Sequence, residues 1–234
     1  MSPSTHAGTV VLVHGAWADG SCWANIILPL RNTGLHVTAA PLPLTSLSDD
    51  AAALQRVIDR THGPVTLVAH AYGGAVIAAV HDERVKSLVY IAALAPDEGE
   101  TVGDVFYRAA PHAEAPALAP DANGLIWMPE EGFAHAVAHN ASPDQIAVMA
   151  AVQRPIAVKC ISEKVPAPAW KTTPSWYLVA EEDRMIVPET QRFMAGRMGA
   201  TIRAHPVDHA PMYTRPSLVV DLVLEAARKT IQPQ

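Results

Sequence analysis

The chain has 234 residues, of which half are hydrophobic and 17% are charged. This length predicts one domain with an insertion, and this much apolar material excludes a disordered chain. The formal charge is −6, without Lys/Arg clusters, which argues against binding to nucleic acid or to an anionic membrane. Two cysteines, Cys22 and Cys160, are too few for a disulfide framework or a cysteine-rich zinc site.

No targeting or membrane-spanning segment is visible in the sequence. Residues 1–6 contain no basic region followed by a long apolar run, so they do not read as a secretory leader. No stretch reaches the roughly 18 consecutive apolar residues that a transmembrane helix needs. We therefore expect a cytoplasmic protein.

Short apolar runs alternate with longer helical patterns along the chain. The runs are mostly continuous, which is typical of parallel strands buried on both faces. Helical patterns follow near 49–62, where Ser48 and Asp49 form a candidate N-cap, near 189–199, and from Pro216 onward. This alternation predicts an α/β fold with a mostly parallel sheet flanked by helices. The predicted strands are residues 9–13, 37–40, 65–69, 86–92, 175–180 and 201–205.

One long region interrupts this alternation. Between about residues 96 and 174 the sequence is rich in Ala and Pro and contains no convincing buried strand. Weak helical patterns occur near 101–109, 130–139 and 143–152. A structureless loop of this length is uncommon in a compact domain, so we expect a helical cap over one end of the sheet. The predicted division is a core of residues 1–96 and 171–234 with a cap of residues 97–170.

The third apolar run ends in a tight turn of small residues and passes directly into a second apolar pattern. This context is typical of a nucleophile elbow, whose pattern is Gly-x-Ser-x-Gly. Ala69 stands in place of the first glycine, and Ala71 stands in place of the serine, ahead of Gly73. The change at position 71 matters because a methyl group has no oxygen with which to attack a carbonyl carbon.

At these residues the sequence resembles the small α/β-hydrolases of the plant methylesterase and hydroxynitrile lyase group and their bacterial relatives. The resemblance spans most of the chain and is weakest in the insertion. It is carried by His14-Gly15-Ala16-Trp17, by the elbow, by Glu182-Asp183-Arg184, and by Asp208-His209-Ala210-Pro211-Met212. The order nucleophile, acid, histidine is that of an α/β-hydrolase.

The resemblance implies a role for each matching residue. Position 71, now Ala71, holds the nucleophile, His209 is the general base, and Asp183 orients His209. The backbone N–H groups of Ala16 and Tyr72 form an oxyanion hole. The resemblance also implies that His14 supports the loop that presents Ala16. Apart from the resemblance, we expect His14, Trp17, Trp127 and Met212 to bind substrate, and ordinary core packing is the alternative for the two tryptophans and Met212.

Several alternatives stay open for individual residues. We favour a Ser→Ala replacement at Ala71 that leaves an inactive variant, but the chain is also compatible with a natural protein that never had the serine. Asp97 is the rival to Asp183, and Asp208 is interpreted as a solvated turn residue. Glu131, His135 and His139 share a helical spacing that we interpret as a solvated face, and we predict no metal site.

The function expected from the resemblance is cofactor-free hydrolysis of a small, largely apolar carboxylic ester by a Ser-His-Asp mechanism. The alternative is a natural protein without the serine, which either binds a small molecule or catalyses a reaction with His209 and Asp183 alone as its base. A hydroxynitrile lyase is less favoured, because in that branch a lysine follows the catalytic histidine whereas Ala210 follows it here. The expected partner is a small-molecule ester, and a homodimer is compatible with the sequence.

Overall fold

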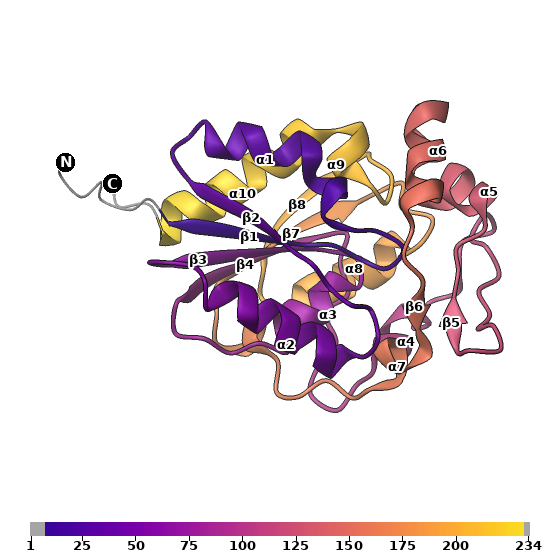
Figure 1. Cartoon of the computed structure of the whole chain (residues 1–234), viewed down its shortest axis with the longest axis horizontal. Helices are drawn as coiled ribbons and strands as arrows, with labels where there is room; N and C mark the ends of the chain where they lie inside the picture. The colour runs from indigo at the N-terminus through magenta and orange to yellow at the C-terminus, as the bar shows by residue number, and fades with distance from the viewer. Residues whose placement is uncertain (1–7, 232–234) are drawn as a thin grey trace.

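Six strands form one parallel sheet in the computed structural model, which describes residues 8–231 (Figure 1). The strand order is β2-β1-β3-β4-β7-β8, and every neighbouring pair is parallel. The order reverses at β1, and in open sheets of this kind ligands bind beyond the carboxyl ends of the strands at such a point. The strands are β1 (Thr9–Val13), β2 (His36–Ala40), β3 (Val65–His70), β4 (Val85–Ile91), β7 (Ser175–Ala180) and β8 (Thr201–His205).

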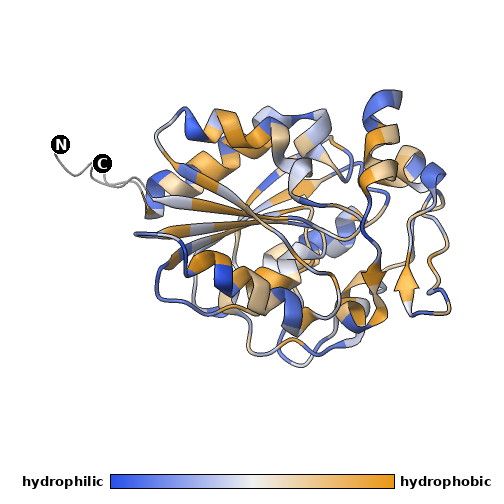
Figure 2. Ribbon diagram, in the orientation of Figure 1, coloured by the Kyte–Doolittle hydropathy of each residue, from blue (hydrophilic) through white to orange (hydrophobic). Residues whose placement is uncertain are grey.

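The six strands predicted from the apolar runs are confirmed, with ends that differ by at most one residue. The reason is visible in β1, where successive side chains point to opposite faces of the sheet. Val10 and Leu12 pack in one apolar layer, whereas Val11 and Val13 pack in the other. Both faces are therefore buried, which produces the continuous apolar runs (Figure 2). Residues 1–6, from which no leader is expected, lie outside the described residues.

Helices cover both faces of the sheet (Figure 1). One layer contains α1 (Ala24–Arg31) and α10 (Pro216–Thr230), whose buried residues share a cluster with Val10 and Leu12. The opposite layer contains α2 (Leu47–Ile58), α3 (Gly73–Ala78) and α8 (Pro188–Arg197). Two short elements, η1 (Gly20–Trp23) and α9 (Pro211–Thr214), complete the loops at the carboxyl ends of the strands.

The N-cap of α2 differs from the expected one. The side chain of Ser46, rather than that of Ser48, accepts a hydrogen bond from the backbone N–H of Asp49 at 3.0 Å. The helix begins earlier because Ser46 has an extended backbone conformation, as an N-cap residue requires, whereas Ser48 already lies inside the helix.

The long region between β4 and β7 consists of short elements that gather at the right of Figure 1, and we call residues 97–170 the cap segment. Contrary to the sequence expectation, it contains two strands, which pair in an antiparallel ladder of two residues each. They escaped prediction because such a short pair has no period of its own. The elements are α4 (Val102–Phe106), β5 (Leu125–Ile126), α5 (Glu130–Gly132), the π-helical η2 (Phe133–Val137), α6 (Pro143–Val152), β6 (Ile156–Ala157), α7 (Val158–Ser162) and η3 (Ala169–Lys171).

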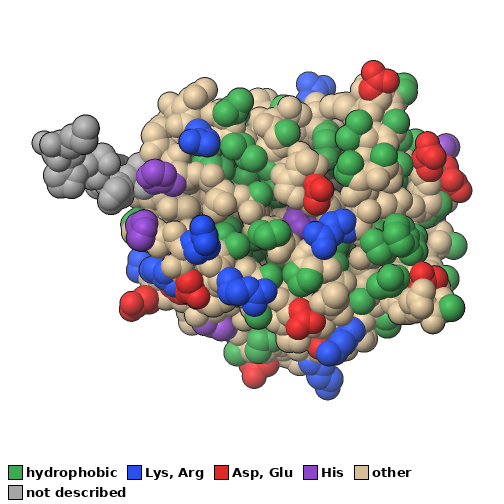
Figure 3. Space-filling view, in the orientation of Figure 1, with side chains coloured by type: hydrophobic (Ala, Val, Ile, Leu, Met, Phe, Trp, Pro, Cys, Tyr) green, Lys and Arg blue, Asp and Glu red, His purple; other side chains and the backbone are tan. Residues whose placement is uncertain are grey.

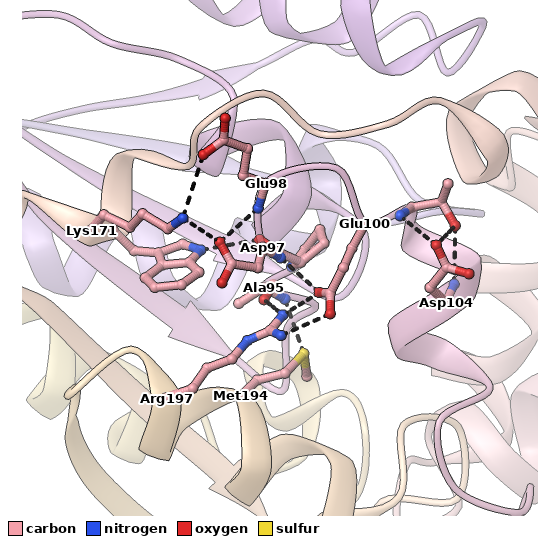
Figure 4. Close-up of polar contacts among 11 residues, drawn as sticks. Ala95, Asp97, Glu98, Glu100, Asp104, Lys171, Met194 and Arg197 are labelled. Atoms are coloured by element: carbon pink, nitrogen blue, oxygen red, sulfur yellow. Dashed lines mark hydrogen bonds and ion pairs between the residues drawn. The ribbon is translucent and has the colours of Figure 1, made fainter.

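Polar contacts tie the start of the cap segment to the core (Figure 4). The guanidinium of Arg197, on α8, donates to a carboxylate oxygen of Glu100 at 2.5 Å and to the carbonyl of Ala95 at 2.7 Å. The ammonium group of Lys171, the residue directly after the cap segment, lies 2.7 Å from the carboxylate of Asp97. The two ends of the insertion are therefore held beside each other.

The surface carries charges of both signs, interspersed over the face seen in Figure 3. Most of the large hydrophobic side chains that stay exposed belong to the cap segment, namely Tyr107, Trp127, Val148, Val152 and Val158. Among residues 8–231, no helix is long and apolar enough to cross a membrane.

Candidate active site

The elbow predicted at residues 69–73 lies where β3 passes into α3, and it holds Ala71 in a left-handed backbone conformation. The φ angle of Ala71 is 49°, and such a conformation costs a non-glycine residue on the order of 1–3 kcal/mol. It is maintained by the carbonyl of Ala71, which accepts hydrogen bonds from the N–H groups of Gly74 at 3.1 Å and Leu94 at 2.9 Å. The strained geometry that exposes a nucleophile is thus present at a residue without one.

Close packing around the elbow explains two glycines, Gly74 on α3 and Gly15 in the loop after β1. A Cβ atom on Gly74 would lie 2.2 Å from the carbonyl oxygen of Leu94, which no packing change can accommodate. A Cβ atom on Gly15 would lie 2.8 Å from the Cβ of Ala71. The loop after β1 therefore packs directly against position 71, at the point where the strand order reverses.

The structure brings His209 and Asp183 together across 26 residues of chain. The Nδ1 atom of His209 lies 2.7 Å from Oδ2 of Asp183, and both side chains are buried. Three further donors hold this carboxylate: the N–H groups of Met185 and Ile186 and the amide of Gln191. Because a carboxylate only accepts, Nδ1 carries the proton, which leaves the lone pair on Nε2 free to act as a base.

His70, next to Ala71, supports the loop of His209. Its Nε2–H donates to the carbonyl oxygen of His209 at 2.7 Å, and the two rings lie 4.6 Å apart. Burial, together with the nearby His209, holds the pKa of His70 well below its ordinary value. His70 is therefore a neutral donor that fixes the position of the base.

The backbone N–H groups of Ala16 and Tyr72 are both available for an oxyanion. No described residue accepts a hydrogen bond from either of them. Both residues line the same cavity as Ala71 and His209. An oxyanion hole needs two N–H donors beside the nucleophile, and these two residues are the candidates for it.

A largely apolar cavity opens in front of Ala71, between the core and the cap segment. Among the described residues that line it, Asp19 supplies the one carboxylate, and no lysine or arginine lines it. Partial burial raises the pKa of Asp19, but hydrogen bonds from the hydroxyl and N–H of Ser21 outweigh this effect and hold it below its ordinary value. The cap segment contributes an apolar wall that includes Phe106, Leu118, Ile126, Phe133, Val137 and Ile156.

Two of the four residues expected to bind substrate line this cavity, and two do not. Trp17 and Met212 lie in its wall, and the indole N–H of Trp17 donates to the carbonyl of Ile126 in the cap segment at 2.9 Å. His14 is fully buried behind the wall, where Nδ1–H donates to the carbonyl of Gly15 and Nε2 accepts from Leu42. It thus supports the loop of Ala16, as expected, without reaching the cavity.

Trp127 lies outside the cavity because its side chain points to solvent. It is 49% exposed, and its indole N–H donates to Asp121 at 3.3 Å. Its neighbour Ile126, the last residue of β5, lines the cavity instead. The expectation that Trp127 lines the cavity was therefore wrong, and the preceding residue takes that place.

The rival acid and the other candidate residues have different partners. Asp97 pairs with Lys171 at the base of the cap segment (Figure 4), whereas Asp183 is the carboxylate that contacts His209. Asp208 is not a solvated turn residue: it is fully buried and accepts hydrogen bonds from Asn140 and Thr214. Through Asn140, Asp208 links the cap segment to the loop that contains His209.

The histidines of the predicted solvated face do not converge. His135 lies 3.5 Å from Glu114, and His139 lies 3.9 Å from Glu182. Within residues 8–231, no three His, Cys, Asp or Glu side chains are placed to share a metal ion. Cys22 does line the cavity, but burial raises the pKa of its thiol well above the ordinary value, which disfavours the reactive thiolate.

Sequence reasoning missed three residues that shape the site: His70, Gln191 and Asp19. His70 could have been suspected from its place beside Ala71. Gln191 is fully buried on α8, where its amide donates to Asp183 and its oxygen accepts from the N–H of Ala180. Nothing in the sequence distinguishes it from a solvated glutamine, because its partners lie on other elements.

Comparisons with known proteins agree with this geometry. A carbendazim hydrolyzing esterase from Nocardioides sp. (strain SG-4G) is 33% identical over 117 residues, which is 43% of this chain and about half (48%) of that esterase. Methylesterase 2 from Arabidopsis thaliana is 24% identical over 97% of this chain and 98% of its own. These relatives are esterases, which supports hydrolysis of esters in general.

Solved structures share the fold. Polyneuridine aldehyde esterase superposes with a TM-score of 0.81 at 18% identity, covering 94% of this chain and 98% of its own. A variant of tomato methylketone synthase I complexed with β-ketoheptanoate superposes with a TM-score of 0.82 at 20% identity. This match covers 95% of this chain and 98% of the synthase chain. The model of the alpha/beta hydrolase family matches residues 10–222. The elbow, the His209–Asp183 pair and this match together establish that the chain belongs to the alpha/beta hydrolase family.

Proposed function

We propose that the site is that of a cofactor-free carboxylic-ester hydrolase in which alanine replaces the serine nucleophile. The observation that carries this proposal is that Ala71 keeps the strained elbow geometry beside an oriented His209 and two available N–H donors. With serine at position 71, Nε2 of His209 would take the hydroxyl proton while the oxygen attacks the ester carbonyl. The N–H groups of Ala16 and Tyr72 would stabilise the oxyanion.

The remaining steps follow from the same groups. His209 would return its proton to the leaving alcohol, and water activated by His209 would then release the acid from the serine. With alanine at 71 no acyl-enzyme can form, and removal of the serine in another hydrolase costs about a million-fold in rate. We interpret the chain as an inactive Ser→Ala variant that binds its ester without cleaving it.

The cavity favours a small, uncharged substrate. Its walls are mostly apolar, so a ligand gains free energy from burying apolar surface. The carboxylate of Asp19 repels an anion, whereas no lysine or arginine of the described residues lines the cavity to attract one. A neutral ester fits this environment better than a free acid.

The test is a pair of proteins, the chain itself and its Ala71→Ser variant, assayed on p-nitrophenyl acetate, butyrate and hexanoate. We expect turnover by the serine form and only background hydrolysis by the alanine form. Ala71→Ser/His209→Ala is the control, and it should lose the gained activity. Ester hydrolysis by the alanine form at the rate of the serine form would refute the proposed mechanism.

A second candidate follows from Ala71 itself, if the chain never carried a serine. His209 and Asp183 would then act without a nucleophile, by moving a proton at a substrate carbon. One structural neighbour, a methylketone synthase variant, is complexed with a β-keto acid. Loss of CO2 from such an acid leaves an enolate that needs one proton at carbon, which a protonated His209 could supply. Release of 2-hexanone from 3-oxoheptanoate by the alanine form, abolished by His209→Ala, would favour this candidate.

A further inference from the structure

A buried carboxylate that the proposed mechanism does not use lies behind the elbow. Asp50, on α2, is fully buried. Its Oδ2 atom accepts a hydrogen bond from the phenol of Tyr72 at 2.6 Å and one from the thiol of Cys160 at 3.7 Å. Its Oδ1 atom accepts from the backbone N–H of Leu44 at 2.7 Å. No basic side chain is among the partners of this carboxylate, so neutral donors alone stabilise it.

The three donors come from three different parts of the molecule. Tyr72 belongs to the elbow, and Cys160 belongs to α7 of the cap segment. Leu44 lies in the loop after β2 with a φ angle of 59°, and its carbonyl accepts a hydrogen bond from Ala157, also in the cap segment. One carboxylate therefore connects the elbow, a strained loop and the cap segment.

The charge of Asp50 depends on these donors. Burial raises the pKa of Asp50, and the hydrogen bonds from Tyr72, Leu44 and Cys160 oppose that effect. Burial and the neighbouring carboxylate raise the pKa of Tyr72 far above its ordinary value, so its phenol keeps the proton and remains a donor. Removal of one donor leaves a buried carboxylate short of a partner, which is costly.

Tyr72 is also the residue whose backbone N–H the proposed mechanism assigns to the oxyanion hole. Its ring is buried, with 3% of the residue exposed, and its far end is held by Asp50. A ring fixed at both ends restricts rotation of the Ala71–Tyr72 peptide. We propose that Asp50 is a positioning residue that aims the N–H of Tyr72 into the oxyanion hole and joins this donor to the cap segment. The kinetic part of this inference rests on the proposed function.

The kinetic test compares Asp50→Asn with Asp49→Asn, both in the Ala71→Ser background. The asparagine side chain has one acceptor oxygen for three donors, so its NH2 group opposes the N–H of Leu44 or the phenol of Tyr72. We expect kcat to fall by about tenfold or more, up to the roughly 10²–10³-fold that loss of a whole oxyanion donor costs, while KM changes little. Asp49 is the exposed neighbour on the same helix, and Asp49→Asn should leave both constants unchanged.

A second measurement needs no esterase activity and uses the chain with Ala71. Labelling with ¹⁵N-tyrosine marks five amides, and the Tyr72→Phe variant identifies the signal of residue 72 by its loss. Asp50→Asn should shift this amide signal and accelerate its hydrogen exchange, whereas Asp49→Asn should not. If Asp50→Asn does not fold, Tyr72→Phe replaces it, because this variant removes the hydrogen bond to Asp50 but keeps the ring and the carboxylate. Labelling with ¹⁵N-phenylalanine then reports the shift and the hydrogen exchange of the amide at residue 72.

The outcomes separate the two proposals. An inactive Ala71→Ser protein whose Tyr72 amide still responds to Asp50→Asn overturns the esterase proposal and supports the positioning role. An active Ala71→Ser protein in which Asp50→Asn changes neither kcat nor the Tyr72 amide overturns the positioning role. A change in KM alone would also overturn it, since it would place Asp50 in ground-state binding rather than in oxyanion stabilisation.

Discussion

The Nδ1 atom of His209 lies 2.7 Å from the Oδ2 atom of Asp183, and both side chains are shielded from solvent. Asp183 follows β7 and His209 follows β8, which are neighbouring parallel strands. Their carboxyl ends therefore meet at the same edge of the sheet as the elbow after β3. A histidine oriented in this way keeps the lone pair of Nε2 free whether position 71 carries a hydroxyl or a methyl group.

Replacement of Asp183 should separate orientation of the base from folding. In the Ala71→Ser background, Asp183→Asn should lower kcat by about 10⁴-fold, because the amide donates to Nδ1 and stabilises the wrong tautomer of the histidine. The matched control is Asp97→Asn, which breaks the contact with Lys171 at the base of the cap segment and should leave kcat within about twofold. Steady-state kinetics measures both, and equal losses in the two variants would contradict the assignment of the acid.

His70 should make the protein less stable below neutral pH. In the unfolded chain a histidine titrates near pH 6.5, whereas burial lowers the pKa of His70 in the folded state. The folded state therefore binds fewer protons, so the contribution of His70 is fully present above about pH 6.5 and is lost as the pH falls toward the folded pKa. The loss amounts to at most about 1.4 kcal/mol per pH unit.

Urea unfolding of the chain and of His70→Asn between pH 5 and 7.5 measures this effect. The asparagine keeps a donor for the carbonyl of His209 but does not titrate, so its free energy of unfolding should vary less with pH. His14 is also buried, and its pKa is likewise lowered by burial, so part of the slope should persist in the variant. His62→Asn, at an exposed position, controls for the substitution itself. An unchanged slope in His70→Asn would show that the folded His70 takes up a proton normally.

Asp19 should select ligands by charge. In the chain with Ala71, hexanol and hexylamine should bind more tightly than hexanoate, because Asp19 supplies the one carboxylate among the described residues of the cavity and no lysine or arginine of those residues lines it. Asp19→Asn should strengthen the binding of hexanoate by about tenfold, or about 1.4 kcal/mol, and should leave hexanol unchanged. Isothermal titration calorimetry gives the three affinities. Tighter binding of hexanoate than of hexanol by the unmodified chain would contradict the proposal of an uncharged substrate. It would favour the second candidate function, in which the substrate is a carboxylic acid.

Gly74→Ala should destabilise the fold strongly. The added methyl group would lie 2.2 Å from the carbonyl oxygen of Leu94, so the backbone of the elbow has to move. We expect a loss of about 3 kcal/mol or more in the free energy of unfolding. Gly196→Ala is the control on α8, where no atom lies within 4 Å of the new methyl group, and it should stabilise by about 0.5–1 kcal/mol. Similar values for the two variants would show that the elbow is less tightly packed than its distances indicate.

The residues that could be predicted from sequence share one property, which is that their pattern is local. The strands appear as continuous apolar runs, and the elbow appears as a strand followed at once by small residues. His209 and Asp183 were identified through the order of short motifs, and the structure brings them into contact. The short strands of the cap segment were not predicted, because a strand of two residues carries too little pattern. For the same reason nothing in the sequence showed that the side chain of Trp127, directly after β5, points to solvent.

The sequence by itself determined the α/β architecture, the place of the elbow and the absence of a nucleophilic oxygen at Ala71, since each depends on neighbouring residues. Only the tertiary structure decided which polar groups share a partner. The thiol of Cys160 donates a hydrogen bond to Asp50, which lies 110 positions away in the sequence. The amide of Gln191, on α8, donates to Asp183 in the loop after β7. Such contacts form because a buried carboxylate needs donors from whatever elements the fold packs around it, and no local pattern records which elements those are.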